Sequence, residues 1–187
     1  MAQAFSTDLQ RATTWSTVLS VLMIIAGILA IASPYYAGLA VTVVVGWLLL
    51  ISAVLHFVYA FRGGRATAVV WEILLAIVYA LIGFYVLANP RIGLGALTFA
   101  IAFYLFVEAI LEFALSYQLR NEGGSASGWM LVDGIITMIL AFLIWANWPN
   151  SSLWAVGIIV GVSMLFSGIT RVMITSAVRR MTTTASV

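Results

Sequence analysis

Residues 15–34 read WSTVLSVLMIIAGILAIASP, and residues 71–90 read WEILLAIVYALIGFYVLANP. Both stretches begin with tryptophan, carry glycine at the thirteenth position and end with proline at the twentieth. Residues 129–149 repeat the pattern with one additional residue before the proline, and Ala141 stands where the other copies have glycine. The chain has three prolines, one in each copy. A period of this length indicates one supersecondary unit that is present three times.

Each copy is long and apolar enough for two membrane-spanning helices separated by a proline turn. About 20 apolar residues span a bilayer core of roughly 30 Å. Proline interrupts the hydrogen-bond ladder of a helix, and the residue before it avoids the helical region. We therefore predict three helical hairpins in one transmembrane domain, residues 1–187, with repeats at 15–61, 69–118 and 129–178. The predicted helices cover residues 15–33, 38–61, 69–88, 93–118, 129–147 and 152–178.

The composition excludes a water-soluble globule. The chain has 187 residues, of which 64% are hydrophobic and 7% charged, and its mean hydropathy is +1.16. A soluble domain carries about 25% charged residues. The predicted fold class is therefore all-α, a polytopic membrane protein with six transmembrane helices. The net charge of +2 does not indicate nucleic-acid binding, because the basic residues lie at helix ends rather than in a patch.

Reactive side chains are too few for a recognisable active site. The sequence has no cysteine and one histidine, which is a poor ligand set for a transition metal. It also has no Ser-His-Asp order, metal-ligand spacing or phosphate-binding loop. We therefore expect no enzymatic activity, no metal and no cofactor. The lipid bilayer is the expected partner, while homo-oligomerisation and any small-molecule or proton ligand are left open.

The distribution of arginines predicts the orientation of the chain in the membrane. Cytoplasmic loops are enriched in Lys and Arg. Six arginines lie on the side of the termini and the longer loops, whereas Arg91 alone lies in a short turn on the other side. We therefore expect both termini in the cytoplasm. The six are Arg11, Arg62, Arg65, Arg120, Arg179 and Arg180.

The second helix of each repeat carries a stripe of small residues at equivalent positions. Small residues let membrane helices approach closely, and Gly157 and Gly161 form a GxxxG motif. The shared stripe predicts that the second helices pack together around a pseudo-threefold axis, with the first helices outside. The equivalent sets are Thr42, Thr98 and Gly157; Gly46, Ala102 and Gly161; and Ala53, Ala109 and Gly168.

Three hairpins bearing the pattern Trp-x11-Gly-x6-Pro, with six spans and short polar loops, resemble the HdeD family of bacterial acid-resistance membrane proteins. The resemblance covers roughly residues 10–180. It implies a location in the bacterial inner membrane and a role in survival at low pH or under related stress. It implies no catalytic residue and no transport substrate. Ala141 and the added residue before Pro149 depart from the pattern and affect the geometry of the third turn.

Six ionisable side chains lie within the predicted spans, where a charge costs roughly 2.5–3.5 kcal/mol on insertion scales and indicates a functional site. His56, Glu112 and Arg171 are equivalent positions three residues beyond the stripe, so threefold packing predicts that they meet at one depth. Glu108 lies one helical turn from Glu112, where two carboxylates share a proton or recruit a cation. The main candidates are His56, Glu108, Glu112 and Arg171, and the secondary candidates are Glu72 and Asp133.

Each candidate has a structural interpretation beside the functional one. Glu112 and Arg171 neutralise each other, His56 forms a hydrogen bond within the bundle, and Glu72 and Asp133 stabilise helix starts. The functional hypotheses are a stress-related membrane protein that senses or moves protons through the cluster, a passive membrane-stabilising or partner-binding component, and a small-solute transporter. The broken helices and inverted repeats typical of many transporters are missing from the sequence.

Overall fold

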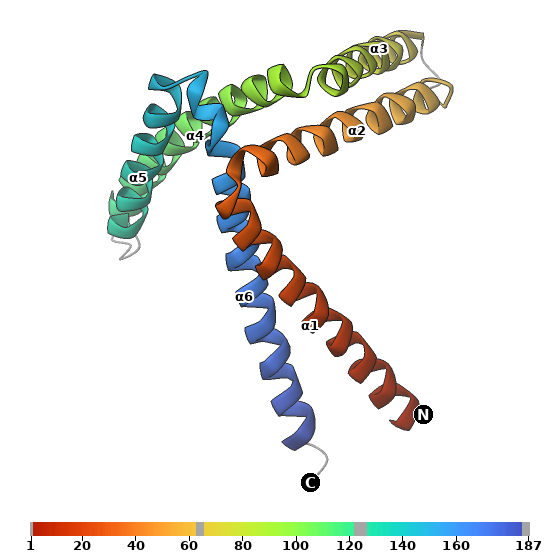
Figure 1. The fold of residues 1–187 in the computed structure, drawn as a ribbon, viewed down its shortest axis with the longest axis vertical. Helices are drawn as coiled ribbons and strands as arrows, with labels where there is room; N and C mark the ends of the chain where they lie inside the picture. Colours follow the sequence, from red (N-terminus) through yellow and green to blue (C-terminus); the bar gives the residue numbers. More distant parts are fainter. Residues whose placement is uncertain (1, 63–65, 122–126, 185–187) are drawn as a thin grey trace. The chain divides into compact units, whose positions relative to one another are not determined.

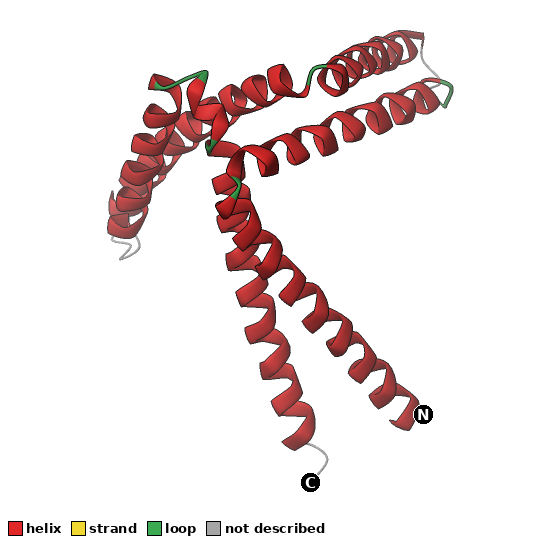
Figure 2. Ribbon diagram, in the orientation of Figure 1, coloured by secondary structure: helices red, strands yellow, loops and turns green. Residues whose placement is uncertain are grey.

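The computed structural model describes residues 2–62, 66–121 and 127–184, and within these ranges it contains helices and no strand (Figures 1 and 2). The polar linkers predicted between the repeats fall on residues 63–65 and 122–126, which lie outside the described residues. The elements in chain order are α1 Ala2–Ala32, α2 Pro34–Ala60, α3 Ala66–Ala88, α4 Pro90–Asn121, α5 Ser127–Ala146, the 3-10 helix η1 Asn150–Leu153, and α6 Ala155–Thr184.

The first two prolines each follow the end of one helix and form the first residue of the next. Pro34 and Pro90 are the first residues of α2 and α4. The carbonyl oxygens of Ser33 and Asn89 accept the first hydrogen bonds of these helices, at 3.1 and 3.0 Å. Proline suits this first position, because its fixed φ is helical and its missing N–H has no partner there. The predicted starts at residues 38 and 93 are therefore several residues late.

The third turn differs from the other two, as the added residue led us to expect. Helix α5 ends at Ala146, a 3-10 turn follows at Asn150–Leu153, and α6 begins at Ala155 rather than at the predicted residue 152. The Trp148–Pro149 peptide bond is cis. The Ser151 hydroxyl is buried and donates a hydrogen bond of 2.7 Å to the Ile144 carbonyl oxygen, which ties the turn back to α5.

The surface of the helices is the kind that faces lipid. Six helices are long and apolar enough to cross a membrane, and 11–22% of the residues in each apolar window are buried. Large apolar side chains such as Trp47, Leu81 and Phe142 are exposed. Apolar exposure on this scale marks contact with lipid rather than with water. The chain is a multi-pass membrane protein, as predicted.

The chain divides into two compact units, of which the first joins the two ends of the sequence: Met1–Ala37 with Gly157–Val187. In this unit α1 and α6 lie side by side (Figure 1). A Cβ atom added to Gly161 would lie 2.9 Å from the carbonyl oxygen of Gly27, and one added to Gly168 would lie 3.0 Å from that of Ser20. These glycines therefore allow backbone-to-backbone packing of α6 on α1.

The second unit, Gly38–Val156, contains two further helix pairs. In the α2–α3 pair, a Cβ atom on Gly83 would lie 3.0 Å from the Gly46 carbonyl oxygen. In the α4–α5 pair, Gly134 packs against Phe113, and a Cβ atom there would lie 2.9 Å from the phenyl ring. Figure 1 shows each pair as neighbouring helices.

The three helix pairs are equivalent in the repeat: α2 packs on α3, α4 on α5, and α6 on α1. The stripe is buried in all three repeats, which confirms that it is a packing surface. The predicted packing of second helices on one another through this stripe is wrong at two positions. Gly46 contacts α3 and Gly161 contacts α1, which are first helices of other repeats. A Cβ atom added to Gly38 of α2 would lie 3.0 Å from the Leu94 side chain of α4 and 3.6 Å from the Val156 side chain.

Candidate functional site

The α2–α3 interface holds a hydrogen bond between the one histidine of the chain and a glutamate. His56 Nδ1 lies 2.6 Å from Glu72 Oε2. An ionised carboxylate can only accept, so Nδ1 carries the proton in this arrangement. The His56 ring stacks on Tyr79 of α3, with centroids 5.2 Å apart and planes inclined by 10°. The side chains of His56 and Glu72 are 30% and 35% exposed, so the pair is partly shielded and still reachable.

Small residues on both helices bring these two side chains within reach. His56 lies between Ala53 and Ala60 of α2, which are 6% and 0% exposed. Glu72 lies one turn before the buried Ala76 of α3. Since the helix backbones approach closely at these alanines, an imidazole and a carboxylate beside them can span the remaining gap.

The α4–α5 interface places carboxyl groups at the corresponding depth. Glu112 is the repeat equivalent of His56, and Thr137 is the equivalent of Tyr79. Thr137 and the Asp133 carboxyl both lie within hydrogen-bonding reach of the Glu112 carboxyl, and Glu108 contributes a third carboxyl nearby. The Glu112 Oε2 atom is buried and has no hydrogen-bond partner. Two carboxyl groups can form a hydrogen bond only if one of them carries a proton.

A tyrosine also contacts the carboxyl group cluster. The Tyr104 hydroxyl donates to Glu108 Oε1 across 3.4 Å, one helical turn away on α4. Asp133 itself is exposed on α5. Within the described ranges, no group of three His, Asp or Glu side chains has the arrangement of a metal site.

Arg171 lies on α6, in the other compact unit, and its side chain is exposed. One turn further along α6, Thr175 and Ser16 of α1 form a hydroxyl–hydroxyl hydrogen bond of 3.2 Å. The structure pairs His56 with Glu72 and surrounds Glu112 with carboxyl groups. The predicted meeting of His56, Glu112 and Arg171 stays a prediction.

Sequence reasoning treated Glu72 as a secondary candidate and missed its partner. The signal was present in the sequence. His56 lies one turn before the end of α2 and Glu72 lies in the second turn of α3, and only a short linker connects these ends. Two helices joined by a short linker are antiparallel neighbours, so residues at matched distances from the linker face each other.

Comparisons with known proteins agree with the threefold repeat. A family model described as a short repeat of unknown function (DUF308) matches residues 18–88, 74–146 and 143–187. The chain is 30% identical over 152 residues to the protein HdeD of Escherichia coli strain K12 and to those of Escherichia coli O157:H7 and Shigella flexneri. This covers 80% of the chain and 78% of each relative. The chain belongs to the HdeD family. No solved structure matches it.

The matched segments of this HdeD-family chain contain the helix pairs described above. The match at 18–88 runs to the last residue of α3, and the match at 74–146 runs to the last residue of α5. Each of these two segments thus contains one second helix together with the first helix that follows it. The α2–α3 and α4–α5 interfaces, with their ionisable side chains, are internal to the family repeat.

Proposed function

We propose that this protein acts in acid resistance in the bacterial inner membrane and that the His56–Glu72 pair is its proton-responsive element. The observation that carries the proposal is the 2.6 Å contact between the imidazole and the carboxylate across the α2–α3 interface. Histidine is the side chain whose ordinary titration falls between about pH 5 and about pH 8. The one histidine of the chain forms this contact.

The proposed response to acid follows from the chemistry of the pair. At neutral pH an ionised Glu72 accepts a charge-assisted hydrogen bond from His56, which is stronger than a neutral one. A proton taken up by the pair changes this hydrogen bond, because a second proton on the imidazole adds a positive charge and a proton on the carboxylate removes the negative one. His56 also stacks on Tyr79, so a change at its ring acts on the same part of the α2–α3 interface.

The carboxyl group cluster at the α4–α5 interface supports a second proton-binding position. Glu112 and Asp133 lie within hydrogen-bonding reach of each other, so a proton between them relieves the repulsion of two charges. We propose proton binding rather than transport, and no catalysed reaction. The alternative is a passive component that stabilises the membrane or binds a partner, with both clusters as structural contacts; transport of a small solute is the second alternative.

Acid survival of a strain that lacks its own HdeD-family protein tests the proposal. Complementation with His56→Gln or Glu72→Gln should fail at protein levels equal to wild type. Thr42→Val is the matched control, because Thr42 is a buried polar residue on the same helix whose hydroxyl donates to the Gly38 carbonyl oxygen and touches neither member of the pair. Full rescue by both pair variants would contradict the proposal and favour the passive component.

We also propose that both termini lie in the cytoplasm, as the arginine distribution indicates. The chain has no cysteine, so single cysteines can be introduced without background. Phe61→Cys and Gln118→Cys should be labelled by an impermeant thiol reagent only from the cytoplasm. Tyr36→Cys and Asn150→Cys should be labelled from the other side. Labelling of Gln118→Cys from outside the cell would overturn this orientation.

A further inference from the structure

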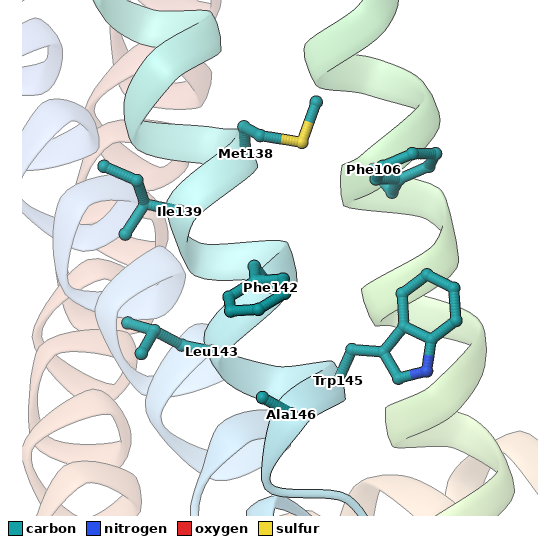
Figure 3. A pocket seen from close by; sticks show the side chains of 7 residues that line it. All are labelled: Phe106, Met138, Ile139, Phe142, Leu143, Trp145 and Ala146. Atoms are coloured by element: carbon teal, nitrogen blue, oxygen red, sulfur yellow. The ribbon is translucent and has the colours of Figure 1, made fainter.

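The α4–α5 pair carries an apolar groove of about 750 Å³. Figure 3 shows Met138 and Trp145 of α5 on the side of Phe106 of α4, with Ala146 at one end of the groove; Phe142 also lines it. Its lining residues are aromatic, aliphatic or thioether side chains. None of the residues that line it is a member of the carboxyl group cluster.

The groove exists because this helix pair is closed by larger residues than the other two. The crossing positions hold Ala102 and Ala141, where the equivalent positions of α2 and α3 hold Gly46 and Gly83. At the α2–α3 interface an aliphatic side chain, Leu87, packs onto the glycine. Its equivalent on α5 is Trp145, which meets Phe106 edge to face at 6.2 Å.

One end of the groove lies near the start of α4. The Trp148 indole N–H donates to the Gly95 carbonyl oxygen at 3.1 Å, which joins the end of α5 to the first turns of α4. On an ideal helix Arg91, Gly95, Phe99 and Phe106 fall within about 80° of one another, so they share one face. Arg91 is exposed. The face that forms the groove therefore begins with a cation.

The distance from the cation to the groove matches one leaflet of a bilayer. Arg91 and Phe106 are 15 positions apart on α4, which is about 22 Å along the axis at the usual rise. A leaflet with its headgroups measures roughly 20–22 Å, half of a bilayer. A molecule with an anionic head at Arg91 and an apolar chain at Phe106 thus has the dimensions of a membrane phospholipid.

We propose that the groove binds one acyl chain of an anionic phospholipid whose phosphate lies at Arg91. Charge complementarity selects the headgroup, since an arginine near the membrane surface attracts anionic lipid. The lining favours a chain over another helix, because membrane helices associate through small residues and this groove presents Phe106, Met138, Phe142 and Trp145. A flexible methionine and aromatic edges adapt to a flexible hydrocarbon.

Native mass spectrometry of the full chain in detergent tests the proposal with two lipids of identical acyl chains, phosphatidylglycerol and phosphatidylcholine. Wild type should bind one phosphatidylglycerol about fivefold more tightly than phosphatidylcholine, as expected for one cation at the headgroup. Arg91→Gln should abolish the preference. Ala146→Leu should weaken the binding of both lipids, because the added carbons occupy the groove.

The chain offers a matched control for each variant. Arg120→Gln removes an exposed arginine at the opposite end of α4, and Ala88→Leu changes the repeat equivalent of Ala146 on α3. Both should bind phosphatidylglycerol like wild type. Equal binding of the two lipids by wild type, or unchanged binding in both Arg91→Gln and Ala146→Leu, would overturn the proposal. A dimer that Ala146→Leu dissociates would show a second copy of the chain as the occupant instead.

Discussion

The α2–α3 and α4–α5 interfaces occupy the same place in the repeat and differ at a few equivalent positions. At the crossing, α2 and α3 have Gly46 and Gly83, whereas α4 and α5 have alanine. Towards the linker, the first interface pairs His56 with a carboxylate, and the second places Glu112 among carboxyl groups. One interface thus joins an imidazole to a carboxylate across closely packed helices, while the other brings carboxyl groups together.

The comparison shows that different residues of the repeated interface set the helix spacing and the chemistry. The small residues determine how closely the helices approach, and their spacing is the same in every repeat. The position three residues beyond the stripe determines the chemistry, and it has diverged to histidine, glutamate and arginine. A repeat that keeps its packing can therefore change its ionisable side chain in one copy without rebuilding the others.

The largest effect is expected from an alanine in the α1–α6 interface, where a glycine of α6 packs against the backbone of α1. Gly161→Ala introduces into α6 the alanine that α4 has at Ala102. The added Cβ would lie 2.9 Å from the Gly27 carbonyl oxygen, a backbone atom that cannot rotate away. We expect a loss of about 1–3 kcal/mol in stability, as overpacking typically costs, measured by thermal unfolding in detergent.

Gly95→Ala is the control for this change, because nothing lies within 4 Å of a Cβ atom at Gly95. It should unfold at the wild-type temperature or slightly above it, since alanine favours a helix over glycine. Equal stability losses for Gly161→Ala and Gly95→Ala would show that α6 does not pack on α1 through its glycine.

A smaller loss of stability is expected from removing the Glu72 carboxylate that accepts the hydrogen bond of His56. Glu72→Gln replaces a charge-assisted hydrogen bond by a neutral one, which should cost about 1–2 kcal/mol at neutral pH. The contribution requires a carboxylate at position 72, so Glu72→Gln should unfold at a lower temperature than wild type in detergent at neutral pH. Equal unfolding temperatures would exclude the contact with His56 as a contribution to stability.

The opposite sign is expected for the equivalent change at the other interface. Glu112→Gln keeps a side chain that can form a hydrogen bond with Asp133 and removes a carboxyl group one helical turn from Glu108. Like charges one helical turn apart destabilise by about 0.2–0.5 kcal/mol, so the variant should be as stable as wild type or slightly more stable at neutral pH. A loss of stability as large as that of Glu72→Gln would show that Glu112 has a cationic partner, as the predicted meeting with Arg171 requires.

The sequence predicted the number of helices, the repeats and the buried stripe because these features are local. A proline after an apolar run ends a helix wherever it occurs, and a small residue at a fixed spacing marks a contact. The stripe alone does not identify the helix that it contacts. We predict from it that Gly46 packs on the other second helices, whereas in the structure Gly46 packs on α3. The high cost of a charge inside a membrane identifies each ionisable residue as a candidate by itself. Its partner depends on which helix lies beside it, and the sequence does not give that.

The pairing of His56 with Glu72 is the central claim, and the imidazole of the single histidine reports it directly. In protein labelled with ¹⁵N-histidine and reconstituted in liposomes, the two ring nitrogen shifts can be followed by NMR from about pH 8 to about pH 5, the range in which histidine titrates. We predict that Nδ1 is protonated and hydrogen-bonded at neutral pH, and that Glu72→Gln changes the Nδ1 shift while Glu108→Gln leaves it in place. Identical ring nitrogen shifts in wild type and Glu72→Gln would contradict the pairing.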